Sequence, residues 1–157
     1  MSESPAIHGT FVIDRSYPAP LAKVFAAFAD PKCKKSWFAE SDTHEIVAFE
    51  SDLRVGGVER LHYRFGPDTP FPGAILTNEG QYHDVVPERR IVTASHMAIE
   101  GRPISVALVT IELSEGDGGT DVTCIFQGVF FEGADGPEMR KGGWEIMFDR
   151  LGASLAA

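Results

Sequence analysis

Glu59 is the residue of this sequence whose type and position best suit chemistry. It lies in the segment 58–65 (Val-Glu-Arg-Leu-His-Tyr-Arg-Phe), which has the alternating pattern of a strand with one dry face and one wet face. The even-numbered positions carry two arginines and a histidine and therefore belong in water. The other face must then point inward, and it consists of Glu59, Leu61, Tyr63 and Phe65. A carboxylate in such apolar surroundings suits acid–base catalysis or the binding of a ligand's hydrogen-bond donor.

Two interpretations of Glu59 stay open at this point. The arginines nearest in sequence lie on the opposite face, so we expect no cation beside the carboxylate. Its expected partner is then a tyrosine or histidine across a cavity, or a donor on a ligand. Alternatively, a bulge at Gly56 and Gly57 turns Glu59 into water, or the residue lies at the rim of the sheet.

No other residues form a recognisable catalytic or metal-binding arrangement. The sequence has no Ser-His-Asp or Cys-His pattern, no phosphate-binding glycine loop, and no histidine or cysteine pair at metal-ligand spacing. We expect most histidines to face solvent, and Cys33 and Cys124 to be free thiols that serve as small buried hydrophobic residues. We therefore assign no catalytic residue beyond the weak candidate Glu59, no metal and no cofactor.

The aromatic side chains are a second group of candidates, because they suit the lining of an apolar cavity. Any one of them fills a core by default, but a sheet curved around one helix leaves space that side chains do not always fill. We predict a cavity lined by these candidate ligand-binding residues: Trp37, Phe38, Glu59, Leu61, Tyr63, Tyr82, Met97, Phe126, Trp144, Met147 and Phe148.

A curved antiparallel sheet and a helix are needed to bring these residues together. Alternating segments bounded by turn residues predict strands at about 10–16, 43–49, 58–65, 74–86, 90–98, 104–114 and 120–130. After the first strand, helical spacing in 21–28 and the Asp30-Pro31 step predict two short helices, the second running to about Phe38. The loop 66–73 contains three prolines and two glycines, and we expect it to act as a mobile flap over one end of the cavity.

The last helix is expected to face this sheet. Its apolar residues share one continuous face at helical spacing: Trp144, Met147, Phe148, Leu151 and Leu155. We expect Trp144 to be buried against the sheet. Gly142 and Gly143 precede this pattern, and we attribute these poor helix formers to a close approach of the backbone to the sheet.

Composition and charge exclude several classes of protein. A chain of 157 residues with 43% hydrophobic and 24% charged residues can bury a sizeable core, so we expect a single domain over 1–157 with a flexible tail at 1–9. The net charge of −9 argues against nucleic acid and membrane surfaces as partners. No segment suits a membrane span and the polar N-terminus does not resemble an export signal, so we expect a cytoplasmic protein. The sequence leaves a homodimer open.

Five segments resemble the START, polyketide-cyclase and birch-pollen-allergen (SRPBCC) superfamily. Residues 11–28 resemble its opening strand, proline-marked turn and helix with a V-F-x-A-F step, and Trp37 and Phe38 its second helix. Residues 52–57 match a D-x-R-V-G-G lead into the third strand, and 80–92 resemble a G-x-Y-x-E-V-V-P-x-x-R-I-V block. Residues 143–151 resemble the final helix. The similarity covers about residues 10–155 and is closest to the activator-of-heat-shock-ATPase-like branch.

The resemblance implies an α+β helix-grip fold: a curved antiparallel sheet of six to seven strands wrapped around a long C-terminal helix, with two short helices after the first strand. In this superfamily the cavity lining differs among lipid carriers, cyclases, ring-hydroxylase subunits and antibiotic-sequestering proteins, so the fold does not settle the function. The co-chaperones that give the branch its name carry an additional N-terminal domain. Because the first strand starts near residue 10, we expect this chain to lack it.

We therefore expect a protein that binds a small apolar or aromatic molecule in a cavity between the C-terminal helix and the concave sheet. One alternative is a cyclase or dehydratase that uses a cavity acid or base such as Glu59. The other is a protein-interaction or co-chaperone-like module that binds through its outer surface.

Overall fold

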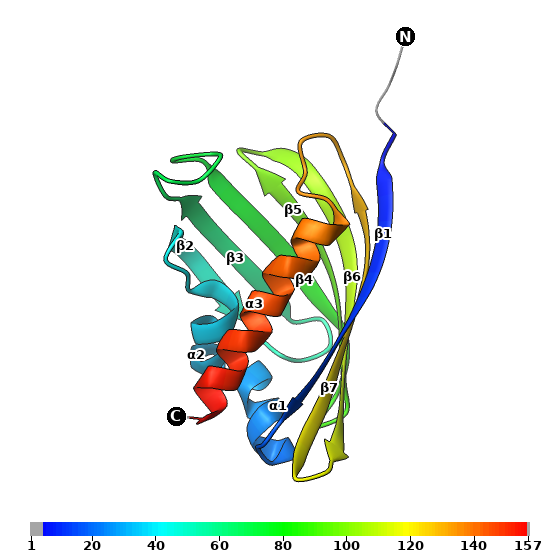
Figure 1. Ribbon diagram of the computed structural model, residues 1–157. Helices are drawn as coiled ribbons and strands as arrows, with labels where there is room; N and C mark the ends of the chain where they lie inside the picture. The colour runs from blue at the N-terminus through cyan, green and yellow to red at the C-terminus, as the bar shows by residue number, and fades with distance from the viewer. Residues whose placement is uncertain (1–4, 157) are drawn as a thin grey trace.

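A single antiparallel sheet of seven strands dominates the computed structural model, which describes residues 5–156 (Figure 1). The strands are β1 (Ile7–Tyr17), β2 (His44–Ser51), β3 (Val58–Phe65), β4 (Ile75–Val86), β5 (Arg90–Ile99), β6 (Arg102–Gly116) and β7 (Gly119–Phe130). Their order is β1-β7-β6-β5-β4-β3-β2, so each strand from β2 to β6 pairs with the next along the chain and β1 pairs with β7. Register shifts in three of the strand pairs help the sheet to curve. The predicted helix-grip fold is confirmed.

The two short helices after β1 form as predicted, the first from its helical spacing and the second from its capping residue. Helix α1 (Leu21–Ala29) buries Val24, Ala27 and Phe28. Helix α2 (Pro31–Lys34) begins where the Asp30 side chain accepts a hydrogen bond from the Lys32 amide at 2.9 Å. The chain then continues as the π-helical turn η1 (Lys35–Ala39), which buries Trp37, Phe38 and Ala39.

The first strand begins earlier than the sequence pattern indicates. Residues 7–9 of the expected tail belong to β1 and pair with residues 128–130 of β7. Gly9 is required there because a Cβ atom would lie 2.4 Å from Cγ of Pro137 at the start of the last helix. Backbone pairing, which needs no apolar side chain, extends the strand. Residues 1–4 lie outside the described part of the chain.

The last helix, α3 (Pro137–Ala156), is also longer than predicted. Gly142 and Gly143 lie inside it rather than ahead of it, and a Cβ atom at either position would meet nothing within 4 Å. The expected close approach to the sheet is therefore wrong. Trp144 is half-buried rather than buried, whereas Phe148, Leu151 and Leu155 are buried.

The C-terminal half of α3 is fixed to the first part of the chain. The Tyr17 hydroxyl donates to the Phe148 carbonyl at 2.8 Å, and Lys23 Nζ donates to the Leu155 carbonyl at 2.8 Å. The ring of Phe148 also stacks on Trp37, with 6.2 Å between ring centroids. Helix α3 thus packs against β1, α1 and η1, and it crosses the concave side of the sheet in Figure 1.

Both cysteines are free, but they differ in exposure. Cys124 is buried on β7, where burial raises the pKa of its thiol to about 12. Cys33 is exposed on α2, so its expected role as a buried residue is wrong. Within the described residues, no helix has the length and apolar content that crossing a bilayer demands.

Replacing Phe148 by alanine should lower the free energy of unfolding by about 3–5 kcal/mol, because its side chain is only 1% exposed and its removal leaves a cavity. Replacing Ile146, which is 54% exposed on the same helix, should change it by no more than about 0.5 kcal/mol. Denaturant titration of both variants measures the difference. Equal losses would show that the inner face of α3 is wrongly assigned.

Candidate ligand-binding site

A pocket of about 690 Å³ lies between α3 and the concave face of the sheet. Strands β3 to β7 form its floor, and α3 and η1 form its roof. Most side chains in its wall are apolar or aromatic, including Phe38, Leu61, Tyr63, Phe65, Leu76, Met97, Ile99, Ile104, Phe126, Trp144 and Met147. Burial raises the pKa of the Tyr63 phenol to about 12, so this hydroxyl is neutral at physiological pH.

Gly143, one of two adjacent glycines in α3, helps to keep this space open. Gly143 lines the pocket, and a Cβ atom there would meet no atom within 4 Å, so a side chain at this position has room to enter. Gly142 also has free space around it but is not part of the wall. Glycine costs about 1 kcal/mol of helix stability relative to alanine. At position 143 the missing side chain leaves open volume in the pocket, at this cost in helix stability.

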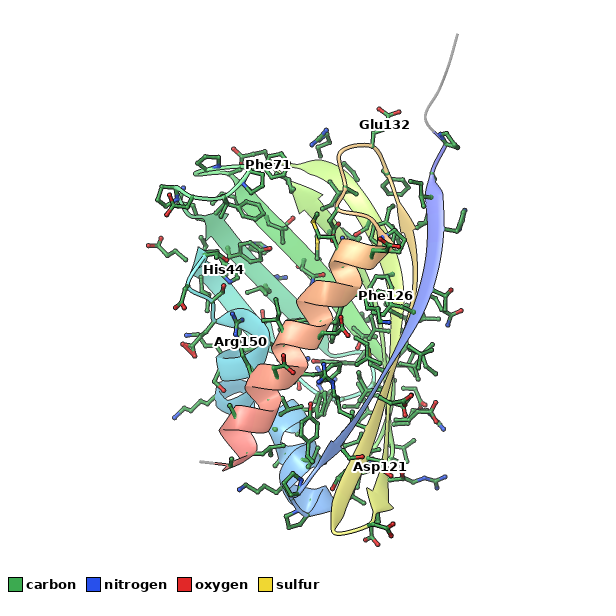
Figure 2. All side chains as sticks on the ribbon, in the orientation of Figure 1. His44, Phe71, Asp121, Phe126, Glu132 and Arg150 are labelled. Carbon is green, nitrogen blue, oxygen red and sulfur yellow. The ribbon has the colours of Figure 1, made fainter. Side chains whose placement is uncertain are left out.

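Exposed side chains in the pocket wall mark its mouth, and they come from α3 and from the loop between β3 and β4. Pro70 and Phe71, from the loop between β3 and β4, line this opening, and Met139 and Ile146 of α3 line it with exposed side chains. Figure 2 shows Phe71 at the loop end of the sheet and His44 at its β2 edge. The loop predicted as a flap therefore contributes to the pocket wall, and its mobility stays a prediction.

A polar pair closes the pocket near the start of α3. Arg140 is buried and donates two hydrogen bonds to the carboxylate of Asp135, both at 2.7 Å, and a third to Ser105 at 3.1 Å. Its guanidinium also lies 4.9 Å from the ring centroid of Phe130. Every charge of this pair is matched, so it forms a neutral section of the wall.

A smaller recess of about 30 Å³ lies on the other side of Phe38 and Trp144, and it contains Glu59. Glu59 is 9% exposed and points inward, as the alternation in β3 predicts. Its carboxylate accepts a hydrogen bond from Nζ of Lys34, a residue of α2 that is 5% exposed. The expectation of no cation beside Glu59 is therefore wrong.

Two hydroxyl groups complete this network. The Lys34 ammonium also donates to the Tyr82 hydroxyl at 2.9 Å, which lies 2.8 Å from the Ser51 hydroxyl and 3.3 Å from the Glu59 carboxylate. Burial alone would lower the pKa of Lys34, but Glu59 and Tyr82 outweigh it and raise the pKa above its ordinary value. Lys34 is thus a buried ammonium, and Glu59 is its counter-ion.

Most of the chain, residues 18–156, matches the model of the family described as Activator of Hsp90 ATPase homolog 1-like protein. The chain belongs to this family. A comparison with curated proteins returns no match.

Solved structures of several bacterial proteins are similar to this member of the Activator of Hsp90 ATPase homolog 1-like family. An uncharacterized protein from Rhizobium leguminosarum is 34% identical, with a TM-score of 0.87 and 97% of each chain covered. A protein from Rhizobium loti is 36% identical, with a TM-score of 0.84 over 97% of this chain and 100% of that chain. A family member from Aeromonas hydrophila is 20% identical with a TM-score of 0.69 over 94% and 92% of the two chains, and it shares the fold.

The structure distributes the predicted site residues of this family member over three places. The wall of the large pocket includes Phe38, Leu61, Tyr63, Met97, Phe126, Trp144 and Met147. Trp37 and Glu59 line only the small recess. Tyr82 and Phe148, each 1% exposed, line neither space and belong to the core.

Sequence reasoning missed Lys34 and His44. Lys34 lies three and four residues before Trp37 and Phe38, a helical spacing that places all three on one face, so this signal was present. His44 lines the pocket and stacks on Tyr63 with 3.8 Å between ring centroids. Burial lowers the pKa of His44, although its Nε2 donates to the Ala39 carbonyl at 2.6 Å. Strand alternation alone could not reveal this residue, because it lies at the very start of β2.

In the part of the chain that the structure describes, no three histidine, cysteine, aspartate or glutamate side chains gather closely enough to hold a metal ion.

Replacing Lys34 by methionine should destabilise the protein by about 3–5 kcal/mol, because the change leaves the Glu59 carboxylate buried without its counter-ion. A second change, Glu59→Gln, removes that charge and should restore most of the loss. Denaturant unfolding of both single variants and the double variant measures the coupling. A cost below about 1 kcal/mol for Lys34→Met, or no recovery in the double variant, would contradict the role of this ion pair.

Proposed function

We propose that this protein binds a small apolar or aromatic molecule in the pocket between α3 and the concave sheet. The observation that carries the proposal is the pocket itself, whose volume of about 690 Å³ falls within the range of small-molecule sites, roughly 300–1,000 Å³. Its wall combines many apolar side chains with few polar ones, as such sites do. Domains of this fold are commonly ligand-binding domains, which agrees with the proposal.

Apolar burial supplies the driving force. Each square ångström of apolar surface removed from water contributes roughly 25 cal/mol, and aromatic walls such as Phe38, Phe126 and Trp144 offer large flat contact areas. We expect the ligand to enter past Met139 and Ile146, because these exposed side chains border the opening.

An enzyme that uses Glu59 as acid or base has less support. The Glu59 carboxylate lies in the small recess, where Lys34 and Tyr82 already occupy it. A general acid or base must reach the substrate proton, and its partners here would have to be displaced first. The interaction-module alternative rests on no particular surface feature, whereas the pocket is a specific one.

The two helix glycines allow a direct test. Gly143→Leu places a side chain in the pocket and should weaken binding of the neutral fluorescent probe N-phenyl-1-naphthylamine by at least about tenfold. Gly142→Leu is the matched control, since this position has equal space but is not part of the wall. Both changes should raise helix stability by up to about 1 kcal/mol. Titration of probe fluorescence against each protein gives the dissociation constants.

No probe binding to the unaltered protein would contradict the proposed function. Equal binding by both variants would show that the probe lies elsewhere on the protein.

A further inference from the structure

The concave face of the sheet carries unpaired polar side chains at the boundary between the pocket and the recess. Asn78 on β4 and Ser95 on β5 line both spaces. In the described part of the chain, no hydrogen bond joins either side chain to another residue, and no enclosed polar atom lacks a partner. Their polar atoms therefore face the open space, where a ligand could reach them.

The strand register shows which residues lie side by side at the boundary between the pocket and the recess. Two successive rows of paired residues cross β3, β4 and β5 on the inner face. One row is Leu61, Asn78 and Met97, and the other is Glu59, Gly80 and Ser95. Gly80 packs closely against β5, because a Cβ atom there would lie 3.2 Å from Cβ of Ser95 and 3.2 Å from Cγ2 of Thr93. A side chain at this position would therefore crowd Thr93 and Ser95, which line the recess.

Size and charge limit what the recess accepts. Its volume of about 30 Å³ suits one or two water-sized groups, such as a hydroxyl or a carbonyl oxygen. Lys34 and Glu59 at its inner end neutralise one another, so neither a carboxylate nor an ammonium group finds an unmatched charge there. Burying an ionised group without a partner is costly, whereas a neutral oxygen needs only one or two hydrogen bonds.

We infer that the ligand is an amphipathic molecule with a neutral oxygen at one end, a hydroxyl or carbonyl that Asn78 and Ser95 hold at the entrance of the recess. The apolar body of the same molecule fills the large pocket, so this inference rests on the proposed function and adds a substrate class and an orientation. The oxygen end points toward the recess and away from Arg150 and His44, which line the pocket from α3 and from the start of β2.

Three probes with the same ring system test the inference. They are 2-naphthol with a neutral oxygen, 2-methylnaphthalene with none, and 2-naphthoate with a charge, each measured by displacement of N-phenyl-1-naphthylamine. The double variant Asn78→Leu/Ser95→Ala should weaken 2-naphthol binding by about tenfold, the value of one to two neutral hydrogen bonds. Binding of 2-methylnaphthalene should stay equal or become tighter. In the unaltered protein, 2-naphthoate should bind at least about tenfold more weakly than 2-naphthol.

Arg150→Gln tests the opposite orientation, in which the polar end of the ligand lies beside Arg150 at the mouth. If 2-naphthoate binds most tightly and this variant weakens it, the polar end lies at the mouth and the inference is wrong. Equal changes for 2-naphthol and 2-methylnaphthalene in the double variant would also overturn it, while the proposed function would stand. If none of the probes binds, both the inference and the proposed function are contradicted.

A second measurement does not depend on the stability of the variants. In the unaltered, nitrogen-15-labelled protein, the side-chain amide signals of Asn78 should shift on addition of 2-naphthol by several times more than on addition of 2-methylnaphthalene. Equal shifts with both compounds would contradict a hydrogen bond at Asn78.

Discussion

The packing of α3 against β1, α1 and η1, rather than against the middle of the sheet, is the constraint on which the rest of the structure depends. Tyr17, Lys23 and Trp37 hold the C-terminal half of the helix at this side. The other half extends over the central strands without filling the space beneath it. A curved sheet and one straight helix cannot match in shape along their whole length, so the pocket follows from this attachment.

Two pairs of opposite charge lie beside the pocket and its recess, and each pair is neutral as a whole. Arg140 and Asp135 neutralise each other near the start of α3, and Lys34 and Glu59 do so in the recess. Such buried pairs add little net stability compared with apolar residues of similar volume, but loss of one partner is costly. The Lys34–Glu59 pair joins α2 to β3, and Arg140 joins the start of α3 to β6 through its hydrogen bond to Ser105. We interpret these contacts as fixing how α2 and the start of α3 meet the sheet.

The sequence predicted best where one physical rule acted alone. Alternation in β3 placed Glu59 inward, and Asp30 with Pro31 marked the start of α2. It failed where a tertiary partner decided the outcome. A lysine among other lysines is expected in water, and only the meeting of α2 with β3 turns Lys34 inward.

The helix period in α3 likewise placed Trp144 on the inner face, but burial there depends on how closely the sheet approaches. The sheet does not pack closely against Trp144, so this half-buried side chain lines the pocket instead. The same separation explains why Gly143 was assigned to a close contact that does not exist. Periodicity reports which side of an element faces inward, but not the distance to what lies opposite.

The central claim is that the space beneath α3 takes up a ligand, and the methionine methyl groups report on it most directly. Met97, Met139 and Met147 line the pocket from the sheet floor, the start of α3 and its middle. In protein labelled with carbon-13 at the methionine methyls, titration with 2-methylnaphthalene should shift all three signals together, with one saturation curve. Three signals that stay unchanged up to the solubility limit of the compound would contradict the account.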